Sequence, residues 1–391
     1  MPPFDLAADL ARLRELNQFR SRRTLGSAQG RKVVVEGREL LNFCSNDYLG
    51  LAAHPALAKA LQNAANEYGV GSGAAHLVCG HSQEHHALEE ELAAWLGRPR
   101  ALLFSTGYMA NLGVITALLG RGDAVFEDRL NHASLLDGGL SSKADFLRYK
   151  HFDLAELESR LQASTAARKL VVTDSVFSMD GDLAPLPELC ATAARHEAWV
   201  MVDDAHALGV LGKTGAGSAE HFGVEGGLGA DQPQIIMGTL GKALGSFGAF
   251  VTGSEDLIDY LINHARSYIY TTAMPPAVAA ATRVAVRLAQ SEGWRRDKLQ
   301  SLIARLRRGL LEQGFTVPPS DTPIQPVILG ESAAALALSQ ALRERGFWVG
   351  AIRPPTVPQG TARLRITLSA AHEEGDVDAL LHALDDIRQA S

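Results

Sequence analysis

Three short polar segments in the middle of the chain each follow an apolar run, and they contain the residues best suited to bind or transform a ligand. The first, residues 105–108, has Ser, Thr and Gly where a helix would begin. The free N–H groups and the positive dipole end of a helix start attract a phosphate. Taken alone, this segment is better explained by ordinary helix capping, which Ser and Thr perform routinely.

The second segment closes the apolar run AWVMV with Asp203 and Asp204, and His206 follows three residues after Asp203. A carboxylate at the end of a buried strand is costly unless it meets a cation or a hydrogen-bond donor. Capping of the next helix is the structural alternative, because strand ends often serve that purpose. The histidine nearby favours contact with a cofactor.

The third segment places Lys242 between glycines, directly after the apolar run 235–240. A single lysine is usually a solvated surface residue, but one confined in this way can become the amine of a Schiff base. Pyridoxal 5′-phosphate (PLP) needs a lysine for its aldehyde, a carboxylate beside its protonated pyridine nitrogen and an anion site for its phosphate. The three segments together supply that set.

The elements that must position these segments alternate between helical stretches and short apolar runs from about residue 55 to 275. Continuous apolar strands separated by helices are typical of a mostly parallel sheet that is covered on both faces. Ligands bind beyond the carboxyl ends of such strands, which is where the three segments lie. The expected strands are the runs 101–104, 123–128, 169–178, 198–207, 233–240 and 248–253.

The remaining chain predicts smaller units around this sheet. Residues 1–24 have leucines at helical spacing, and the alternating run after them, with a turn at Glu36–Gly37, predicts a hairpin. A long helical pattern over 277–314 is followed by alternating runs and a last helix. We therefore expect three parts, listed in chain order: an N-terminal helix and hairpin segment at 1–45, a large α/β domain at 46–276, and a small C-terminal α+β domain at 277–391.

Composition excludes several classes of protein. Of 391 residues, 46% are apolar and 21% are charged, which is an ordinary globular mixture. A net charge of −7 disfavours a nucleic-acid partner. No apolar run reaches the ~20 residues of a membrane span, and no secretion signal is recognisable. Cys44, Cys79 and Cys190 lie too far apart to indicate a disulfide frame or a zinc ribbon. These features predict a cytoplasmic protein without a membrane or nucleic-acid partner.

The ordered motifs resemble the α-oxoamine synthases, which are fold-type I, aspartate-aminotransferase-like PLP enzymes. The similarity extends from Arg20 to His372. It is carried by SNDYLGLAAHP, GSGAAHLVCGHSQEHHALEEELA, FSTGYMANLGVI, NHASLLDG, DSVFSMDGD, VDDAHALGVLG, GTLGKALG, YIYTTAMPP and RPPTVPQGTARLRITLSAAH. The resemblance implies a large domain with a mostly parallel seven-stranded sheet, a smaller C-terminal α+β domain, and PLP as the cofactor.

The resemblance also implies roles for single residues. Lys242 would hold PLP and later move the Cα proton, Asp203 would pair with the pyridine nitrogen, and His206 would hydrogen-bond the 3′-oxygen. His132 would stack on the ring and orient the substrate, although it could also simply cap the helix that follows. These four are the expected catalytic residues. The further positions expected to contact the cofactor are Gly107, Tyr108, Ser178, Thr239, Thr271 and Thr272. In related enzymes the loop equivalent to the last two reaches the phosphate of the neighbouring subunit, which implies a homodimer.

For the substrate, Arg353 matches the residue that binds the amino acid carboxylate, since a guanidinium pairs with it bidentately. A solvated loop charge is the alternative interpretation of this arginine. Asn46 would assist it, and Arg20 and Thr356 match positions near the acyl substrate. Asp174 stands where the family more often has Glu, so we leave it out of the expected site.

Two segments narrow the expected activity. HLVCGH and RPPTVPQGTARLR are most similar to the biotin-pathway members of the family. The resemblance thus implies a decarboxylative condensation of L-alanine with pimeloyl-CoA or a pimeloyl-carrier protein. The alternative is another α-oxoamine synthase, which would use glycine or serine with a different acyl-CoA. A PLP-carrying protein without catalysis is disfavoured by the complete residue set, and an NAD-dependent oxidoreductase by the missing glycine fingerprint.

A histidine cluster, His81, His85 and His86 in GHSQEHH, has a spacing that could share one metal ion on a helix. The HExxH order of a zinc protease is absent, and the matching family segment binds no metal. We therefore expect no metal site there.

Overall fold

The computed structural model describes residues 5–224 and 229–389. By internal contacts the chain forms two compact units. The small unit consists of Met1–Tyr48, Met179–Gly181 and Asp297–Ser391, and the large unit of Leu49–Ser178 and Asp182–Arg296. The three-part division expected from the sequence stays a prediction.

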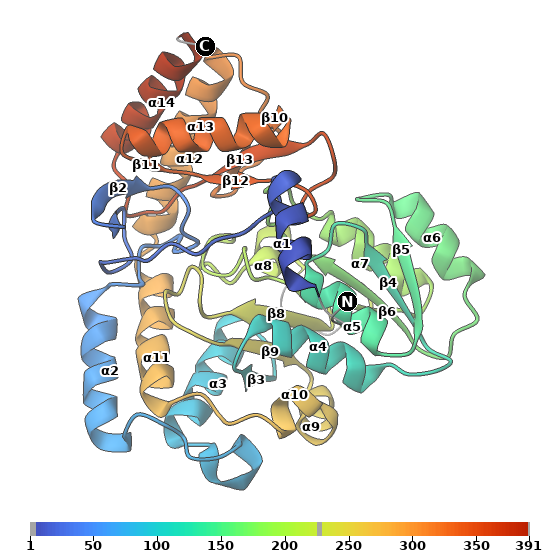
Figure 1. Ribbon diagram of the computed structural model, residues 1–391. Coiled ribbons are helices and arrows are strands. Elements are labelled where there is room, and N and C mark those ends of the chain that lie inside the picture. Colours follow the sequence, from blue (N-terminus) through green and yellow to red (C-terminus); the bar gives the residue numbers. More distant parts are fainter. Residues whose placement is uncertain (1–4, 225–228, 390–391) are drawn as a thin grey trace. The chain divides into compact units, whose positions relative to one another are not determined.

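The large unit is built on a seven-stranded sheet with the order β3-β9-β8-β7-β6-β4-β5 (Figure 1). Its strands are β3 (Arg100–Phe104), β4 (Ala124–Asp128), β5 (Asp145–Tyr149), β6 (Lys169–Asp174), β7 (Trp199–Asp203), β8 (Ile235–Thr239) and β9 (Ala249–Gly253). The pairs from β5 to β8 are parallel, and β9 is antiparallel to both of its neighbours. This topology confirms the predicted mostly parallel sheet.

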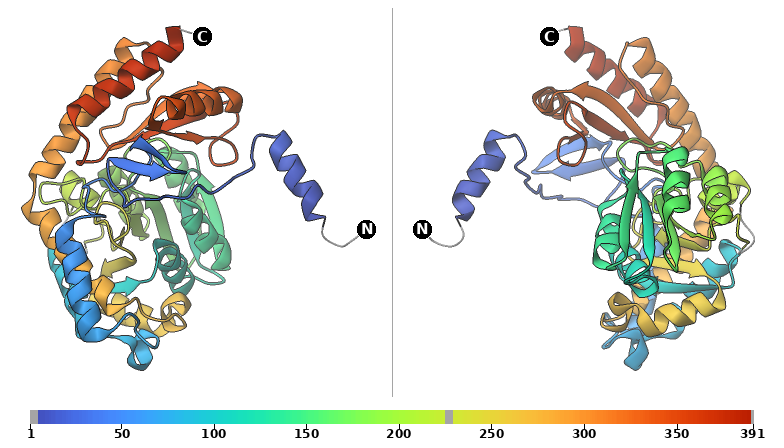
Figure 2. Two further views of the ribbon diagram at one scale, coloured as in Figure 1. Left: turned by 60° about the vertical axis from the view of Figure 1, so that its left-hand side comes forward. Right: turned by 90° about the vertical axis from the view of Figure 1, so that its right-hand side faces the viewer.

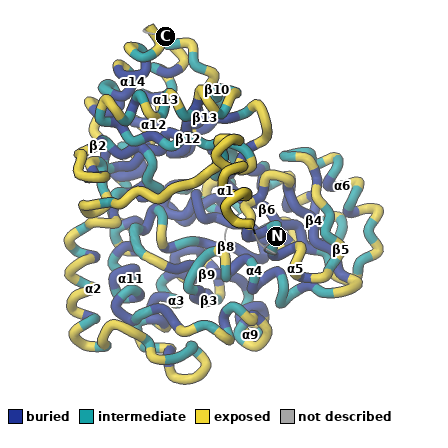
Figure 3. Tube along the Cα trace, in the orientation of Figure 1, coloured by how far each residue is buried: buried dark blue, intermediate teal, exposed yellow. Residues whose placement is uncertain are grey.

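Successive residues of the buried strands supply two separate cores. In β7, Met201 packs into one core with helices α4 (Gly107–Leu118), α5 (Ala133–Ser141), α9 (Glu255–His264) and α10 (Arg266–Ile269). Val200 and Val202 pack into the other core with α6 (Leu154–Ala163) and α7 (Leu186–Arg195). Because side chains alternate along a strand, helices on both faces require the continuous apolar runs seen in the sequence. The buried strands are the dark-blue stretches at β6 and β8 in Figure 3.

The helices of the large unit connect these strands. They are α2 (Pro55–Tyr68), η1 (His76–Gly80, a π-helical turn), α3 (Gln83–Trp95), α4 (Gly107–Leu118), α5 (Ala133–Ser141), α6 (Leu154–Ala163), α7 (Leu186–Arg195), α8 (Ser218–Phe222), α9 (Glu255–His264), α10 (Arg266–Ile269) and α11 (Pro276–Ser291). No described helix combines the length and the apolar character that a membrane span requires.

The small unit contains two three-stranded sheets, β1-β2-β11 and β10-β13-β12. Its strands are β1 (Lys32–Val35), β2 (Arg38–Asn42), β10 (Ile324–Gly330), β11 (Phe347–Trp348), β12 (Gly350–Ile352) and β13 (Ala362–Thr367). Its helices are α1 (Leu6–Glu15), α13 (Ser332–Glu344), α14 (Glu374–Gln389) and most of α12 (Trp294–Glu312). Helices α12 and α14 run side by side (Figure 2), and Arg305 of α12 binds Asp378 of α14 at 2.6 Å.

Two helices expected from the sequence differ in extent. The helix expected over 1–24 is confined to α1, because Asn17 has a left-handed φ of 54° that ends it. The long helix expected over 277–314 is divided at Gly293 into α11 and α12. The hairpin turn at Glu36–Gly37 is confirmed by the antiparallel pairing of β1 with β2.

Candidate active site

The candidate site begins where three neighbouring parallel strands end. Asp174 at the end of β6 is in register with Asp203 at the end of β7, and Asp203 is in register with Met237 of β8. Asp174 and Asp203 are both buried. The sheet therefore brings two carboxylates to the edge where ligands of such folds bind.

Lys242 lies on the turn that follows β8. Its Nζ is 2.8 Å from Nε2 of His206, which lies on the turn after β7. The turn is tight: the Gly245 N–H donates to the Lys242 carbonyl, and a Cβ at Gly245 would come within 2.3 Å of the Ala52 nitrogen. A side chain at Gly245 would clash with that neighbouring backbone, so this glycine permits the close approach of the turn.

Asp203 is held by two donors. Its Oδ2 accepts from Nδ2 of Asn111 at 2.7 Å, and its Oδ1 accepts from the Ala205 N–H at 3.0 Å. Asn111 lies fully buried on α4, and its Nδ2 also donates to Oγ of Ser134 at 2.9 Å. These hydrogen bonds fix the orientation of the carboxylate. They also offset part of the cost of burying its charge, although both donors are neutral.

The same network reaches His132. The Ser134 hydroxyl lies 2.7 Å from Nδ1 of His132, and the Ser134 N–H also points at that nitrogen, at 3.3 Å. Because Ser134 Oγ already accepts from Asn111, its proton is available for His132, which assigns the imidazole proton to Nε2. Burial lowers the pKa of His132, while Asp203 opposes that shift.

Asp174, which we left out of the expected site, contacts the backbone of His132. Its Oδ2 accepts the His132 N–H at 2.6 Å, and its own N–H donates to Oδ1 of Asn131 at 3.2 Å. Burial, and then the nearby Asp203, raise the pKa of Asp174 well above its usual range. Asp174 therefore positions the start of α5 rather than presenting a charge to a ligand.

The segment 105–108 forms the start of α4, as expected. Thr106 is the N-cap, and its Oγ1 accepts the Met109 N–H at 3.2 Å. The N–H groups of Gly107 and Tyr108 belong to the first turn, where the helix offers no carbonyl partner. A helix start of this kind suits a phosphate group.

These residues fit PLP. The structure places an amine, an imidazole and an oriented carboxylate on adjacent turns of one sheet edge, and the free end of a twelve-residue helix follows the nearby strand β3. Lys242, Asp203, His206 and His132 are thus brought together as expected. Their individual roles stay predictions.

The other predicted cofactor contacts lie on several elements of the large unit. Thr239 ends β8 and donates to the Gly248 carbonyl at 3.1 Å, and Ser178 lies half-buried in a turn that follows β6. Thr271 and Thr272 lie between α10 and α11, where Thr272 pairs with Ala75. Contact of Thr271 and Thr272 with a partner's phosphate stays a prediction.

Four of the predicted substrate residues belong to the small unit: Arg20, Asn46, Arg353 and Thr356. Arg20 Nη2 donates to Oγ1 of Thr356 at 3.1 Å, and Arg353 donates to the Asn17 carbonyl. Burial and the neighbouring Arg20 lower the pKa of Arg353. The small unit therefore gathers two guanidinium groups with the Thr356 hydroxyl, a combination suited to an anionic substrate.

Asn46 has a partner that the sequence did not indicate. Its Oδ1 accepts from Nη1 of Arg365 at 3.1 Å and from the Tyr48 hydroxyl at 3.2 Å. Arg365 is buried on β13, and a basic residue inside the apolar run of that strand was the available signal.

Sequence reasoning also missed Asn111 and Ser134. The available signal was the position of Asn111 beside Ala110 and Val114, on the apolar face of a helix. A polar residue on such a face needs a buried partner, and here the partner is Asp203.

The comparisons with known proteins agree with this geometry. The model of the family "Aminotransferase class I and II" matches residues 38–384. The 8-amino-7-oxononanoate synthase of Cellvibrio japonicus is 60% identical over 386 residues, which cover 99% of this chain and 96% of the relative. The Methylococcus capsulatus enzyme of the same name is 61% identical and covers 98% of both chains.

Solved structures give the same fold. The serine palmitoyltransferase of Sphingomonas wittichii superposes with a TM-score of 0.93 at 32% identity, covering 100% of this chain and 98% of that one. The 8-amino-7-oxononanoate synthase of Francisella tularensis has a TM-score of 0.78 at 30% identity, covering 90% and 98%. A serine palmitoyltransferase variant from S. paucimobilis, at a TM-score of 0.92 and 31% identity over 98% and 97%, was solved with a bound PLP–myriocin aldimine.

Proposed function

The chain belongs to the class I and II aminotransferase family and, within it, to the 8-amino-7-oxononanoate synthases, and from this we propose how its own residues perform that reaction. The enzyme is PLP-dependent and acts in biotin biosynthesis. Its reaction joins L-alanine to a pimeloyl thioester and releases CO₂ and the free thiol. The observation that carries the assignment of residues is the 2.8 Å approach of Lys242 Nζ to His206, on the turn beside Asp203.

PLP, when bound, supplies an aldehyde that links to amines and a protonated ring that withdraws electrons from an attached Cα. Lys242 would hold the cofactor through its Nζ, and the same nitrogen would take and return the Cα proton of alanine. Asp203 would keep the pyridine nitrogen protonated, and Asn111, which donates to its Oδ2, would fix the carboxylate for that task. Such preorganised charges stabilise a developing negative charge without reorganisation during the reaction.

His206 and His132 orient the reacting groups. The Nε2 of His206 faces the lysine amine and would hydrogen-bond the 3′-oxygen of the cofactor. His132, fixed by Ser134 at Nδ1 and by Asp174 at its backbone, would stack on the ring. Such stacking would orient the substrate for the reaction. The first turn of α4, with Gly107 and Tyr108, would bind the phosphate.

The finer assignments concern substrates and assembly. We propose that Arg353, assisted by Asn46, binds the alanine carboxylate, and that Arg20 and Thr356 meet the acyl substrate as its CoA or carrier-protein thioester. The hydrogen bond between Arg20 and Thr356 supports a shared role. We also propose a homodimer in which Thr271 and Thr272 reach the partner's phosphate, and a cytoplasmic location.

Borohydride reduction of the holoenzyme, followed by peptide mapping, tests the central assignment. The label is expected on the peptide that contains Lys242, and a label on another lysine would contradict the proposal. A panel of alanine, glycine and serine against pimeloyl and longer acyl thioesters, scored by CO₂ release, tests the substrate. Preference for serine with a palmitoyl thioester would instead favour the activity of the structural neighbours.

A further inference from the structure

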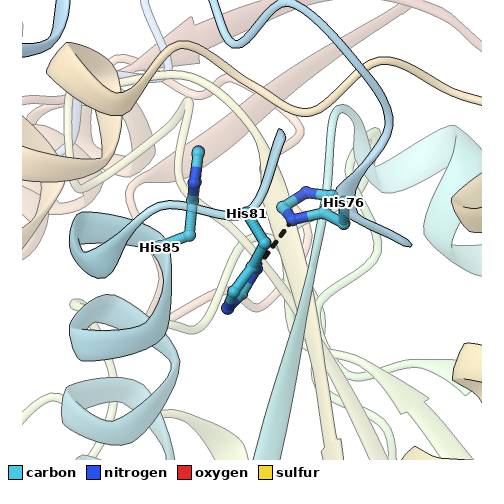
Figure 4. A group of neighbouring side chains, drawn as sticks. All are labelled: His76, His81 and His85. Carbon is cyan, nitrogen blue, oxygen red and sulfur yellow. Dashed lines mark hydrogen bonds between the residues drawn. The ribbon is translucent and has the colours of Figure 1, made fainter. Parts of the chain in front are cut away.

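A second cluster of side chains that could bind a ligand lies on η1, on α3 and on the short segment between them, which carry none of the proposed cofactor residues. His76, His81 and His85 converge there (Figure 4), and His86 and Glu89 lie beside them on α3. A cavity of about 520 Å³ is lined by His76, His81, His86 and Glu89 together with Tyr268. Nothing in the proposed reaction uses these residues.

His85 has a structural task in this cluster. Its Nδ1 accepts the Ser82 N–H at 3.0 Å, and its Nε2 lies 2.7 Å from the Met274 carbonyl. Both ring nitrogens are therefore engaged, the first as an acceptor and the second as a donor. His85 closes the capping box of α3 and is not available to a ligand.

His81 is oriented differently. Its Nδ1 lies 2.9 Å from Nδ1 of His76, which is the dashed contact in Figure 4. When the His81 nitrogen donates in this pair, the lone pair of its Nε2 is directed away from His76. That Nε2 lies 4.0 Å from Oε2 of Glu89. An imidazole that donates one N–H to a neighbour and offers its other nitrogen has the arrangement of a metal-bound histidine.

Glu89 and His86 complete a set of three. Glu89 Oε1 accepts the Leu103 N–H at 3.0 Å, which fixes the carboxylate and turns its other oxygen toward His81. One ligand atom each from His81, His86 and Glu89 lies within 4.8 Å of the other two. A tetrahedral zinc ion with bonds of about 2.0–2.2 Å needs ligand atoms roughly 3.4 Å apart. The exposed His81 and His86 side chains can close that gap by small rotations.

We propose that His81 Nε2, His86 and Glu89 Oε2 bind a first-row divalent cation, preferentially Zn²⁺, with His76 as the outer partner of His81. Two imidazoles and one carboxylate favour zinc over Mg²⁺ or Ca²⁺, which prefer oxygen ligands. Arg100 lines the same cavity, but Glu255 and Asp259 bind its guanidinium at 3.3 and 2.6 Å and compensate its charge.

From the sequence we considered a metal ion shared by His81, His85 and His86 and expected none, and we did not include Glu89 or His76. The ligands follow the order H-x4-H-x2-E, from a turn into the first two turns of α3, which is not the HExxH order of one helix. His76 lies too far along the chain to be assigned to His81 without the π-helical turn between them. A bound ion would tie the end of η1 to α3.

Titration of the holoenzyme with Co²⁺, read by its visible absorption bands and by displacement with Zn²⁺, tests the proposal. Wild type is expected to bind one Co²⁺ per chain, and His86→Ala to lose it. His86 is exposed and contacts Glu90 at 3.5 Å and the His81 ring at a centroid distance of 6.0 Å, so this variant should keep its fold. Glu89→Gln retains an acceptor for Leu103 and should also weaken binding. His264→Ala, on the exposed end of α9, and Cys79→Ser are the matched controls and should bind as wild type does.

His76→Phe separates a metal site from adsorption on surface histidines. Phe can keep the stacking of His76 on Tyr268, which has a centroid distance of 5.1 Å, but it removes the partner of His81. Loss of such an outer partner is expected to lower the affinity about 10- to 100-fold. Absence of saturable one-to-one binding in wild type, or Co²⁺ retained equally by His86→Ala, would overturn the proposal. The latter result would also be expected for an ion held by the cofactor.

Discussion

Asn111 and Asp203 are joined by a 2.7 Å hydrogen bond between two buried side chains, one on α4 and the other at the end of β7. The same amide nitrogen reaches Ser134, whose hydroxyl meets His132. The carboxylate proposed for the pyridine nitrogen and the imidazole proposed for the ring face are therefore held by one uncharged network. Such a network orients both groups without adding a competing charge.

Replacing Asn111 tests that network. Asn111→Ala should lower kcat/KM about 10- to 100-fold, because a hydrogen bond to a charged group contributes about 1.5–3 kcal/mol. The PLP dissociation constant should rise in the same variant, and both quantities can be measured by titration and steady-state kinetics. Thr116→Ala is the matched control on α4, since that hydroxyl donates only within its own helix. Equal effects of the two variants would contradict a positioning role for Asn111.

Substitution of the two central groups should separate their roles. Lys242→Ala should abolish turnover, because the amine proposed to hold the cofactor and to move the proton is removed. Asp203→Asn should retain part of the PLP and lose most of the activity, because an amide does not hold the ring nitrogen protonated. Absorption spectra and CO₂ release measure both outcomes. Normal turnover by Lys242→Ala would refute the proposed role of Lys242.

The sheet and the centre of the site were predictable because the local apolar pattern of the sequence corresponds directly to the buried strands of the fold. Buried parallel strands must be continuous apolar runs, so the residues that end those runs, such as Asp203, mark the ligand edge. Asn111 was not predictable in the same way. Its role depends on which face of α4 is turned toward β7, and that is decided by packing across the sheet rather than by its neighbours in sequence.

The extent of α1 is an example in which the local pattern predicted more structure than the fold contains. Its leucines keep their helical spacing to Leu16, yet the helix ends at Glu15 and its leucines are exposed. An apolar stripe that is not packed against a core does little to extend a helix. The histidine cluster was visible in part, but His76 joined it only through the turn at η1.

Asp174 allows a hydrogen bond to be tested separately from a charge. Asp174→Asn keeps an acceptor for the His132 N–H, while Asp174→Ala removes it. Because the pKa of Asp174 is raised in the folded protein, ionisation of this carboxyl opposes folding. The stability of the protein should therefore fall as the pH rises from the ordinary pKa of an aspartate through the raised pKa of Asp174. The stability of Asp174→Asn should therefore depend less on pH over this range, and the variant should keep most of its activity. Asp174→Ala should lose about 1–3 kcal/mol of stability and have lower activity. Urea unfolding across pH and kcat measure this, and equal behaviour of the two variants would contradict it.

His151 should also make stability fall as the pH rises, because its pKa too is higher in the folded than in the unfolded state. Burial alone would lower the pKa of His151, but hydrogen bonds to Asp128 at 3.0 Å and Asp182 at 2.9 Å outweigh it and raise the pKa to about 9. The unfolded value is about 6.5, so the protonated form contributes its full stabilisation below that pH. This contribution is lost as the pH rises through about 9.

The predicted result is a fall in melting temperature between pH 6.5 and 9.5 that is steeper in wild type than in His151→Gln. Glutamine can still bond to one of the two carboxylates but does not titrate, so the variant should be less stable at pH 6.5 and should approach wild type at pH 9.5. His264→Gln, whose exposed ring bonds only to the Tyr260 carbonyl of its own helix, serves as the control and should follow the wild-type curve. A His151→Gln curve parallel to that of wild type would show that His151 is not the titrating group, because no other substitution has been made. Scanning calorimetry of the holoenzyme at constant ionic strength measures the effect, since salt would otherwise screen the half-exposed imidazole differently at each pH.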